Sequence, residues 1–277
     1  MDIKKTALIT AGILACAAAP GLYNGLKVQH YSVESEKIKN NVRIALVTDL
    51  HSCRYGEHEQ KLISRIYENK PDVILLGGDI FDHRIPDNNT EYFLAGTAEK
   101  YPCYFVTGNH EYMSGEDAFY KKMLILEKYG VTRLCGEAVT ENFNGNSINI
   151  GGISDYTSVG YPFDNTRTVG EQLDTIKEET ANGNYTVLLS HRPELIHTYA
   201  EYGFDLVLAG HAHGGQWRIP HVLNGTYSTG QGLFPKCAGG EYNENGTKMI
   251  VSRGLARETT VVPRIYNRPE LVIIDLN

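Results

Sequence analysis

Residues 206–220 read LVLAGHAHGGQWRIP, and the prediction of the fold begins with this stretch. Its first four residues are apolar, as in a strand that is buried in a sheet, and the run ends at Gly210. Two histidines, His211 and His213, follow directly and are themselves followed by two glycines. A buried strand that ends in two imidazoles one residue apart raises the question of whether other strands end similarly.

Short apolar runs rich in Val, Ile and Leu recur along the whole chain and alternate with stretches of helical periodicity. We predict strands that begin near residues 42, 72, 103, 147, 185, 205, 248 and 271, and helices over 57–69, 115–129, 170–181 and 193–201. Strands that alternate with helices indicate a layered α/β domain. In open sheets of this kind, sites form at the carboxyl ends of the strands.

Five of the predicted strands end in acidic, amide or imidazole side chains. A single histidine after a strand is more often an ordinary core or surface residue than a ligand, but five such endings favour one shared site. The endings are DLH (Asp49, His51), GDIFD (Asp79, Asp82), GNHE (Asn109, His110, Glu111), SH (His191) and GHAH (His211, His213).

The residue types at these strand ends are typical of a hydrolytic metal site. Carboxylate, amide and imidazole ligands suit manganese, iron or zinc, whereas structural zinc favours cysteine. The candidate ligands exceed what one tetrahedral ion needs and suit two ions. Two ions about 3.5–4 Å apart can share a carboxylate and a bridging hydroxide and act on a phosphoryl group. The candidates are Asp49, His51, Asp79, Asn109, His191, His211 and His213.

The ordered set D-x-H, GDxxD, GNHE, a single H and GHxH resembles the calcineurin-like metallophosphoesterase superfamily, and it runs from Asp49 to His213. The resemblance implies a four-layer α-β-β-α sandwich of two mixed β-sheets flanked by helices, with the metal site at the C-terminal ends of the strands. It also implies a role for each residue. Asp49, His51 and His213 bind the first ion, Asn109, His191 and His211 bind the second, and Asp79 bridges them.

The same resemblance makes His110 the general acid that protonates the leaving oxygen and Asp82 its orienting partner. For Glu111 two alternatives stay open, support of His110 or capping of a loop. Arg84, Arg192 and Arg218 could each contact a phosphate, but we expect each to be an ordinary solvent-exposed arginine.

The sequence around Asp82 bears on the substrate. Protein phosphatases of the superfamily continue this motif as DRG, whereas here His83 follows the acid and Arg84 comes one position late. A phosphoprotein substrate is therefore disfavoured. The segments GLFPK, VSRGL and NRPEL resemble a bacterial membrane-associated phosphodiesterase branch that includes UDP-2,3-diacylglucosamine pyrophosphatase-like proteins, which implies a phosphodiester or pyrophosphate bond in a small-molecule or lipid-linked substrate. A cytoplasmic nucleotide phosphodiesterase or phosphomonoesterase and a non-catalytic metal-binding scaffold remain as alternatives.

Residues 1–27 have the layout of a signal anchor or signal peptide, because Lys4 and Lys5 precede an uncharged segment over 6–26. Pro20 lies where cleavage would occur, so we favour a retained anchor, with lipid attachment at Cys16 and a packed N-terminal helix as alternatives. An anchor with its lysines inside places the catalytic domain, residues 42–277, outside the cytoplasm, either membrane-anchored or exported. Residues 28–41 are predicted to form a polar linker.

The composition of the chain excludes some partners and leaves other questions open. The 277 residues are 42% hydrophobic with a formal net charge of −7, so no overall positive field favours nucleic acid. Five cysteines without a CxxC motif leave the disulfide state open. Residues 214–242 are either a flexible apolar wall beside the site or a hairpin packed on its own sheet. The oligomeric state is also open.

Overall fold

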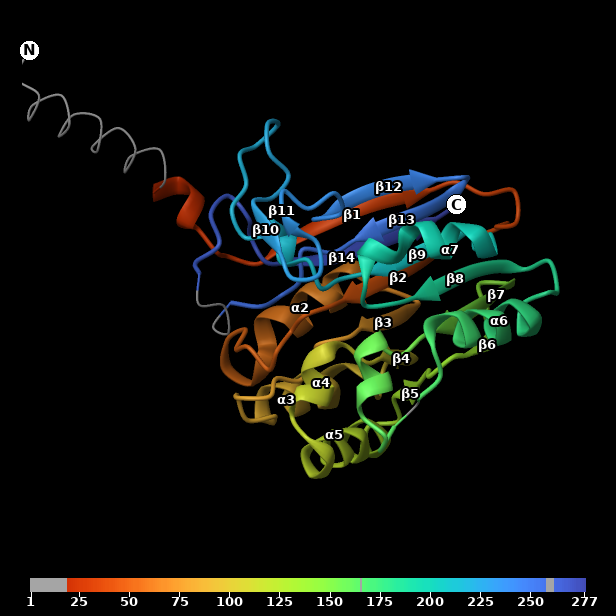
Figure 1. Ribbon diagram of the computed structural model, residues 1–277, viewed down its shortest axis with the longest axis horizontal. Helices are drawn as coiled ribbons and strands as arrows, with labels where there is room; N and C mark the ends of the chain where they lie inside the picture. Colours follow the sequence, from red (N-terminus) through yellow and green to blue (C-terminus); the bar gives the residue numbers. More distant parts are fainter. Residues whose placement is uncertain (1–18, 165, 258–261) are drawn as a thin grey trace, which may run out of the picture.

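Two six-stranded mixed sheets form the centre of the fold in the computed structural model, which describes residues 19–164, 166–257 and 262–277 (Figure 1). The first sheet has the order β1 (Lys27–Val33), β14 (Glu270–Leu276), β2 (Val42–Val47), β3 (Val73–Gly77), β4 (Cys103–Val106) and β5 (Thr132–Arg133). The second has the order β12 (Gly240–Glu244), β13 (Thr247–Val251), β9 (Leu206–Ala209), β8 (Tyr185–Leu189), β7 (Asn146–Gly152) and β6 (Glu137–Phe143).

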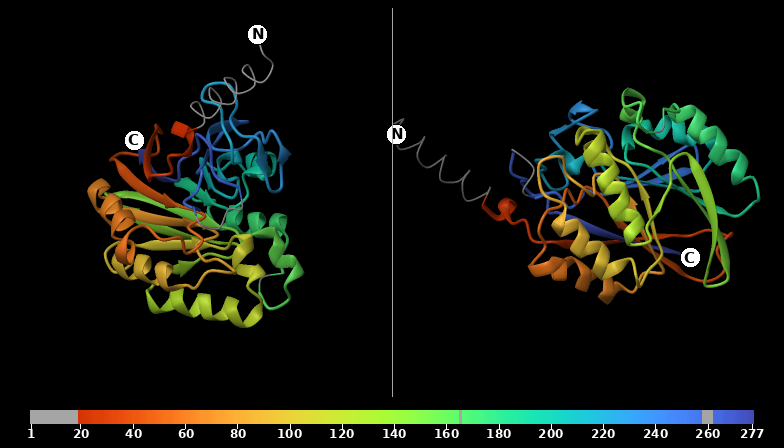
Figure 2. Two further views of the ribbon diagram at one scale, coloured as in Figure 1. Left: turned by 90° about the vertical axis from the view of Figure 1, so that its left-hand side faces the viewer. Right: turned by 90° about the horizontal axis from the view of Figure 1, so that it is seen from below.

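Helices cover the outer face of each sheet, so the fold has four layers (Figure 2). The first sheet packs against α2 (Gln60–Asn69), α3 (Asn88–Thr97) and α5 (Glu116–Lys128), and the second against α6 (Val169–Glu179) and α7 (Ile196–Tyr202). This arrangement confirms the α-β-β-α class that the resemblance implies.

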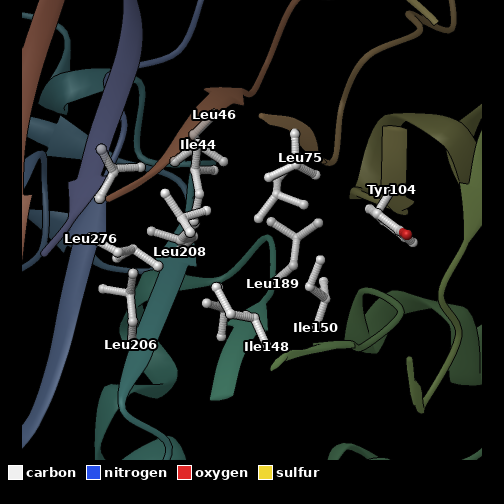
Figure 3. Packing of buried hydrophobic residues seen from close by; sticks show 14 of the residues in the cluster. Ile44, Leu46, Leu75, Tyr104, Ile148, Ile150, Leu189, Leu206, Leu208 and Leu276 are labelled. Atoms are coloured by element: carbon white, nitrogen blue, oxygen red, sulfur yellow. The ribbon is translucent and has the colours of Figure 1, made fainter. Parts of the chain in front are cut away.

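The inner faces of the two sheets meet in one apolar core (Figure 3). In β2, Ile44 and Leu46 face the second sheet, while Ala45 and Val47 face the helices. Side chains alternate between the two faces of a strand, so a strand that is covered on both sides must be apolar throughout. This explains why the central strands could be predicted from continuous apolar runs.

The predicted linker is wrong over its first residues. Lys27–Val33 forms β1, which pairs in parallel with β14 at the edge of the first sheet. Only the last residue of β1, Val33, is buried, and the other positions are half-buried or exposed. An edge strand with so few buried positions lacks the continuous apolar run by which the central strands are predicted.

Several smaller elements were not predicted from the sequence. They include α3 and the edge strand β6, whereas β10 (Tyr227–Ser228) and β11 (Gly232–Leu233) form a hairpin within residues 214–242. The predicted helices over 57–69 and 193–201 begin with the short 3-10 turns η2 (Glu57–Glu59) and η4 (Pro193–Leu195). Cys53, Cys103, Cys135 and Cys237 form no disulfide with one another.

The predicted N-terminal anchor falls mostly on residues 1–18, which lie outside the described residues. Within the part of the chain that the structure describes, no helix has both the length and the apolar character needed to cross a bilayer. The chain enters the described part through the short turn η1 (Ala19–Leu22).

Candidate metal centre

The loops after five strands meet where the carboxyl ends of the two sheets converge. Asp49 follows β2, Asp79 follows β3 and Asn109 follows β4, all in the first sheet. His191 follows β8 and His211 follows β9, both in the second sheet. The site therefore lies across the two sheets, and the packing of the core between them fixes its geometry.

One group of possible metal ligands consists of Asp49, His51 and His213, whose ligand atoms all lie within 4.8 Å of one another. Nε2 of His213 is 3.6 Å from Oδ1 of Asp49. The rings of His51 and His213 are stacked with 5.2 Å between their centroids. The structure thus brings together the three residues predicted for the first ion.

A second group consists of Asp79, His191 and His211, also with all ligand atoms within 4.8 Å. Nε2 of His191 lies 3.2 Å from Oδ2 of Asp79 and 3.1 Å from Nδ1 of His211. Nδ1 of His191 donates to the carbonyl oxygen of Gly77 at 2.9 Å, which directs Nε2 toward the site. Burial alone would lower the pKa of His191, but the neighbouring Asp79 carboxylate raises it to about 10.

Asp79 lies between the two groups. Its Oδ2 is 3.2 Å from Nε2 of His191 and 3.6 Å from Nε2 of His51. Its Oδ1 accepts a hydrogen bond from the backbone N of His110 at 2.8 Å. One carboxylate oxygen therefore faces an imidazole of each group, which is the arrangement that a bridging ligand requires.

Asp82 contacts two histidines rather than one. Its Oδ2 is 3.1 Å from Nδ1 of His110 and also 3.1 Å from Nδ1 of His51. Burial would raise the pKa of Asp82, but hydrogen bonds from His110 and His51 hold it well below its usual range. The same contact raises the pKa of His110 against the opposing effect of burial. The predicted partner of His110 therefore also orients a predicted metal ligand.

His83 and Glu111 take positions that the motifs left open. Nδ1 of His83 lies 3.0 Å from Nδ1 of His110. Glu111 is buried and accepts hydrogen bonds from the backbone N of Asp79 (3.0 Å), Phe81 (3.0 Å) and Gly108 (2.7 Å). Burial raises the pKa of Glu111 to about 7. Of the two alternatives for Glu111, the structure shows the one in which it caps the loops.

The backbone at the site has an unusual conformation. Asp49, His51, Asp79, His211 and His213 have φ values of 50°, 50°, 52°, 63° and 47°, in the left-handed region that non-glycine residues rarely adopt. Gly254, with φ 69°, passes so close that a Cβ there would lie 2.6 Å from Cβ of Asp49. Strain of this kind persists where the surrounding fold imposes it, and it gathers at functional sites.

Arg192 is buried at the site, so the expectation of a solvent-exposed side chain is wrong for this arginine. The residue is 4% exposed, and Asp155 supplies the charge that makes burial possible through bonds to Nε and Nη2. Nη1 donates to Nε2 of His211 at 2.6 Å and Nη2 to Oδ1 of Asn109 at 3.3 Å. Arg192 thus joins a predicted metal ligand from each sheet.

Neither of the other two candidate arginines is buried at the ligand groups. The side chain of Arg84 is 53% exposed, with Nε 3.8 Å from Oδ1 of Asp82. Arg218 donates to the carbonyl oxygen of Asn224 at 2.8 Å, within its own loop.

Arg264 is a site residue that the sequence motifs missed. It is 6% exposed, and its Nη2 lies 3.2 Å from Nδ1 of His213. It stands outside every motif, and the one available signal is a charged residue after Pro263 in a mostly apolar stretch. Each histidine of the GHAH motif therefore has a buried arginine on one ring nitrogen, Arg192 on Nε2 of His211 and Arg264 on Nδ1 of His213. In each case the other ring nitrogen faces the ligand group.

The hairpin β10–β11 leaves its apolar side chains outside the core. Tyr227 is 50% exposed, Leu233 72% and Phe234 66%. Trp217, in the preceding loop, is 44% exposed. The hairpin of the second alternative is therefore present, but these apolar side chains stay exposed.

Comparison with known proteins agrees with this geometry. The family model described as calcineurin-like phosphoesterase matches residues 42–215. A metallophosphoesterase of Aquifex aeolicus is 30% identical over 91% of this chain and 92% of its own length. The protein YpbG of Bacillus subtilis is 27% identical over 98% of both chains.

Solved structures share the fold at low sequence identity. The NAD nucleotidase of Haemophilus influenzae superposes with a TM-score of 0.52 and 16% identity, over 82% of this chain and 46% of the nucleotidase. A 5′-nucleotidase precursor of Thermus thermophilus gives a TM-score of 0.51 and 14% identity, over 78% of this chain and 49% of that one. The length of the family match and the identity to the Aquifex protein show that this chain belongs to the calcineurin-like phosphoesterase family and is a hydrolase.

Proposed function

We propose that the protein hydrolyses a phosphodiester or pyrophosphate bond with the aid of two divalent ions, one held by each group of ligands. The family is dependent on divalent metals, and the described residues contain both groups. The observation that carries the proposal is Nε2 of His51, which is buried, has no hydrogen-bond partner among the described residues and lies 3.6 Å from Oδ2 of Asp79. A buried polar atom without a partner costs about 1–3 kcal/mol, and a coordinated cation would remove that cost.

The residues present fit such ions. Asp49, His51 and His213 would hold one and Asn109, His191 and His211 the other, with Asp79 shared. Oxygen and imidazole ligands without thiolate suit manganese, iron or zinc. When bound, the ions would supply Lewis-acid chemistry, which activates water and stabilises charge on phosphoryl oxygens.

The other residues of the site would handle the proton and the substrate. Asp82 holds Nδ1 of His110 at 3.1 Å, which leaves Nε2 of His110 to give its proton to the leaving oxygen. The buried guanidinium of Arg192 would contact a phosphoryl oxygen beside Asn109. His83, in place of the arginine of the DRG motif, follows Asp82 and its Nδ1 lies 3.0 Å from Nδ1 of His110, which supports a substrate other than a phosphoprotein.

The test is hydrolysis of bis(4-nitrophenyl) phosphate with added manganese by Asp79→Asn and His191→Ala variants. We expect each to lose at least about 100-fold in kcat/KM, because each removes a ligand of the ions that stabilise the transition state. The exposed residues Asp117 and His197 provide the matched controls Asp117→Asn and His197→Ala. Full activity in either site variant would contradict the metal assignment.

We also propose that residues 1–27 keep the protein at a membrane, with the catalytic domain outside the cytoplasm. Apolar side chains exposed beside η1 support this: Leu22 is 50% exposed, Tyr23 64% and Trp217 44%. Tyr266 N donates to the carbonyl oxygen of Gly21 at 2.7 Å, and Ile265 forms a bridge with Trp217, so these segments adjoin. An apolar surface of this kind suits contact with lipid.

Membrane fractionation and protease treatment of intact cells test this location. The full chain should stay in the membrane fraction in high salt and be cut from outside, whereas a chain lacking residues 1–18 should be released. Trp217 is the only tryptophan, so a blue shift of its emission on addition of anionic vesicles would report contact by this surface. A full chain found in the soluble fraction and protected from protease would instead support the cytoplasmic nucleotide phosphodiesterase.

A further inference from the structure

A cavity of about 590 Å³ opens beside the second group of ligands. Asn109 and Arg192 line it on the side of the metal centre. Part of the lining comes from the 3-10 turn η3 (Tyr156–Gly160), and Thr229 and Gly230 of the β10–β11 connection also contribute. Because Arg192 contacts both Asn109 and His211, a phosphoryl group held at this ligand group would direct one of its substituents into the cavity.

The lining of the cavity includes two tyrosines and, among the described residues, no acidic side chain. Tyr156 is 39% exposed, Met113 is 51% exposed, and Tyr161 completes the wall. Arg192 is the one charged residue in the lining. In a chain of net charge −7, a cavity lined in this way suits an uncharged group attached to an anionic phosphoryl group.

The Tyr156 ring is held in a fixed relation to the metal centre. The guanidinium of Arg192 covers one face of the Tyr156 ring, with its central carbon 4.4 Å from the ring centroid. Asp155 binds the same guanidinium and also accepts from the backbone N of Thr157 at 2.9 Å and from its hydroxyl at 2.7 Å. The wall and the arginine are thus joined through one buried carboxylate, while the Tyr156 residue stays 39% exposed.

We infer that this cavity binds a planar aromatic ring on the substrate, with Tyr156 as the residue that selects it. A ring in the cavity can stack on Tyr156, and the sulfur of Met113 makes favourable contacts with ring edges. The hydroxyl of Thr229 can donate to or accept from polar atoms at the edge of a heterocycle, and that of Thr157, whose proton goes to Asp155, can accept from them. An acyl chain lacks such atoms. The substrate class is therefore an aryl or nucleobase-bearing phosphoester. This inference rests on the proposed function.

The test uses phosphonates that share one anionic head and differ in the attached group. Methylphosphonate, benzylphosphonate, cyclohexylmethylphosphonate and octylphosphonate are measured as competitive inhibitors of manganese-dependent hydrolysis, and by calorimetry on the manganese-loaded protein. Stacking of one ring on an aromatic side chain changes affinity by about 10-fold. We expect benzylphosphonate to bind about 10-fold more tightly than cyclohexylmethylphosphonate, which has a similar size but no planar ring.

Substitutions at Tyr156 then assign the effect. The ratio of the cyclohexylmethyl to the benzyl inhibition constant should fall to about 1 in Tyr156→Leu and stay near 10 in Tyr156→Phe. Tyr67→Leu is the matched control, because Tyr67 is 37% exposed on α2 and lies outside the cavity. Thermal melts confirm that the variants fold.

Each outcome has a separate meaning. Equal affinity of the benzyl and cyclohexylmethyl compounds in the unchanged protein would overturn the inference, and so would tightest binding of the octyl compound. A benzyl preference that survives Tyr156→Leu would also overturn it. If methylphosphonate competes in all of these cases, the proposed function stands. If no phosphonate binds the manganese-loaded protein, the proposed function itself fails.

Discussion

At the scale of single residues, the site depends on side chains that serve two neighbours at once. Asp79 faces an imidazole of each ligand group, and Asp82 holds both His51 and His110 at 3.1 Å. The two contacts of Asp82 separate its effects from those of His110. Under the proposed function, loss of Asp82 would disturb both a metal ligand and the proton donor, whereas loss of His110 would remove the donor and leave the Asp82 contact to His51 in place.

Substitution of His110 should therefore lower turnover without lowering metal content. We expect His110→Gln to reduce kcat by about 10²–10⁴-fold for alkyl leaving groups, since these need a proton, and by much less for 4-nitrophenolate. Asp82→Asn should reduce both kcat and the bound metal. The checks are steady-state kinetics over a series of leaving groups and elemental analysis of each variant. An equal loss of kcat across the series would count against the acid role.

Gly254 should be required by the position of Asp49. In Gly254→Ala the added Cβ would lie 2.6 Å from Cβ of Asp49, so the carboxylate must move and metal at the first group should be lost. Gly130 is the control, because it has φ 70° and open space where a Cβ would stand. Both variants should lose about 1–2 kcal/mol of unfolding free energy from left-handed backbone. Unchanged metal content in Gly254→Ala would contradict this account.

At the scale of elements, the sequence is informative where a strand is buried on both faces. The central strands have continuous apolar runs and were predicted, because burial by a second sheet on one side and helices on the other leaves no polar position. β1 was mistaken for a linker because only Val33 of this strand is buried. The position of β1 is set by its pairing with β14. In this pairing Lys27 lies opposite Glu270, which is 243 positions further along the chain (270 − 27).

Removal of β1 should destabilise the domain. A chain over residues 42–277 loses the partner of β14 and the burial of Val33, so its free energy of unfolding should fall by at least about 2 kcal/mol relative to residues 19–277. The exposed β14 edge should also promote aggregation. Chemical denaturation and light scattering test both effects. Equal stability of the two chains would show that residues 28–41 contribute nothing to the stability of the domain. That result would agree with a linker and contradict this account.

At the scale of the whole molecule, the site exists because two sheets converge. The motifs predicted which residues gather there, since the carboxyl ends of neighbouring parallel strands meet at one edge of a sheet. They did not predict Arg192 or Arg264 as buried. The burial of Arg192 depends on Asp155, which follows a different strand, and Arg264 reaches His213 across 51 positions of sequence. Such contacts are set by the packed fold and leave no local pattern.

A site built between two sheets should couple metal binding to stability. A ligand that binds only the folded state adds about 2.7 kcal/mol when present at 100 times its dissociation constant. We therefore expect manganese to raise the melting temperature of the metal-free protein and a chelator to reverse the change. The Asp79→Asn variant should show a smaller rise. Differential scanning calorimetry measures these melting temperatures. The same melting temperature with and without manganese would count against a site between the sheets.

The central claim is that each of the two ligand groups holds one ion. The most direct measurement is the number of divalent ions bound per chain, by elemental analysis after free manganese is removed. The account predicts close to two ions in the unchanged protein, and close to one in each of His213→Ala and His211→Ala, which remove a ligand from one group only. One ion or fewer per chain in the unchanged protein at saturating manganese would contradict it.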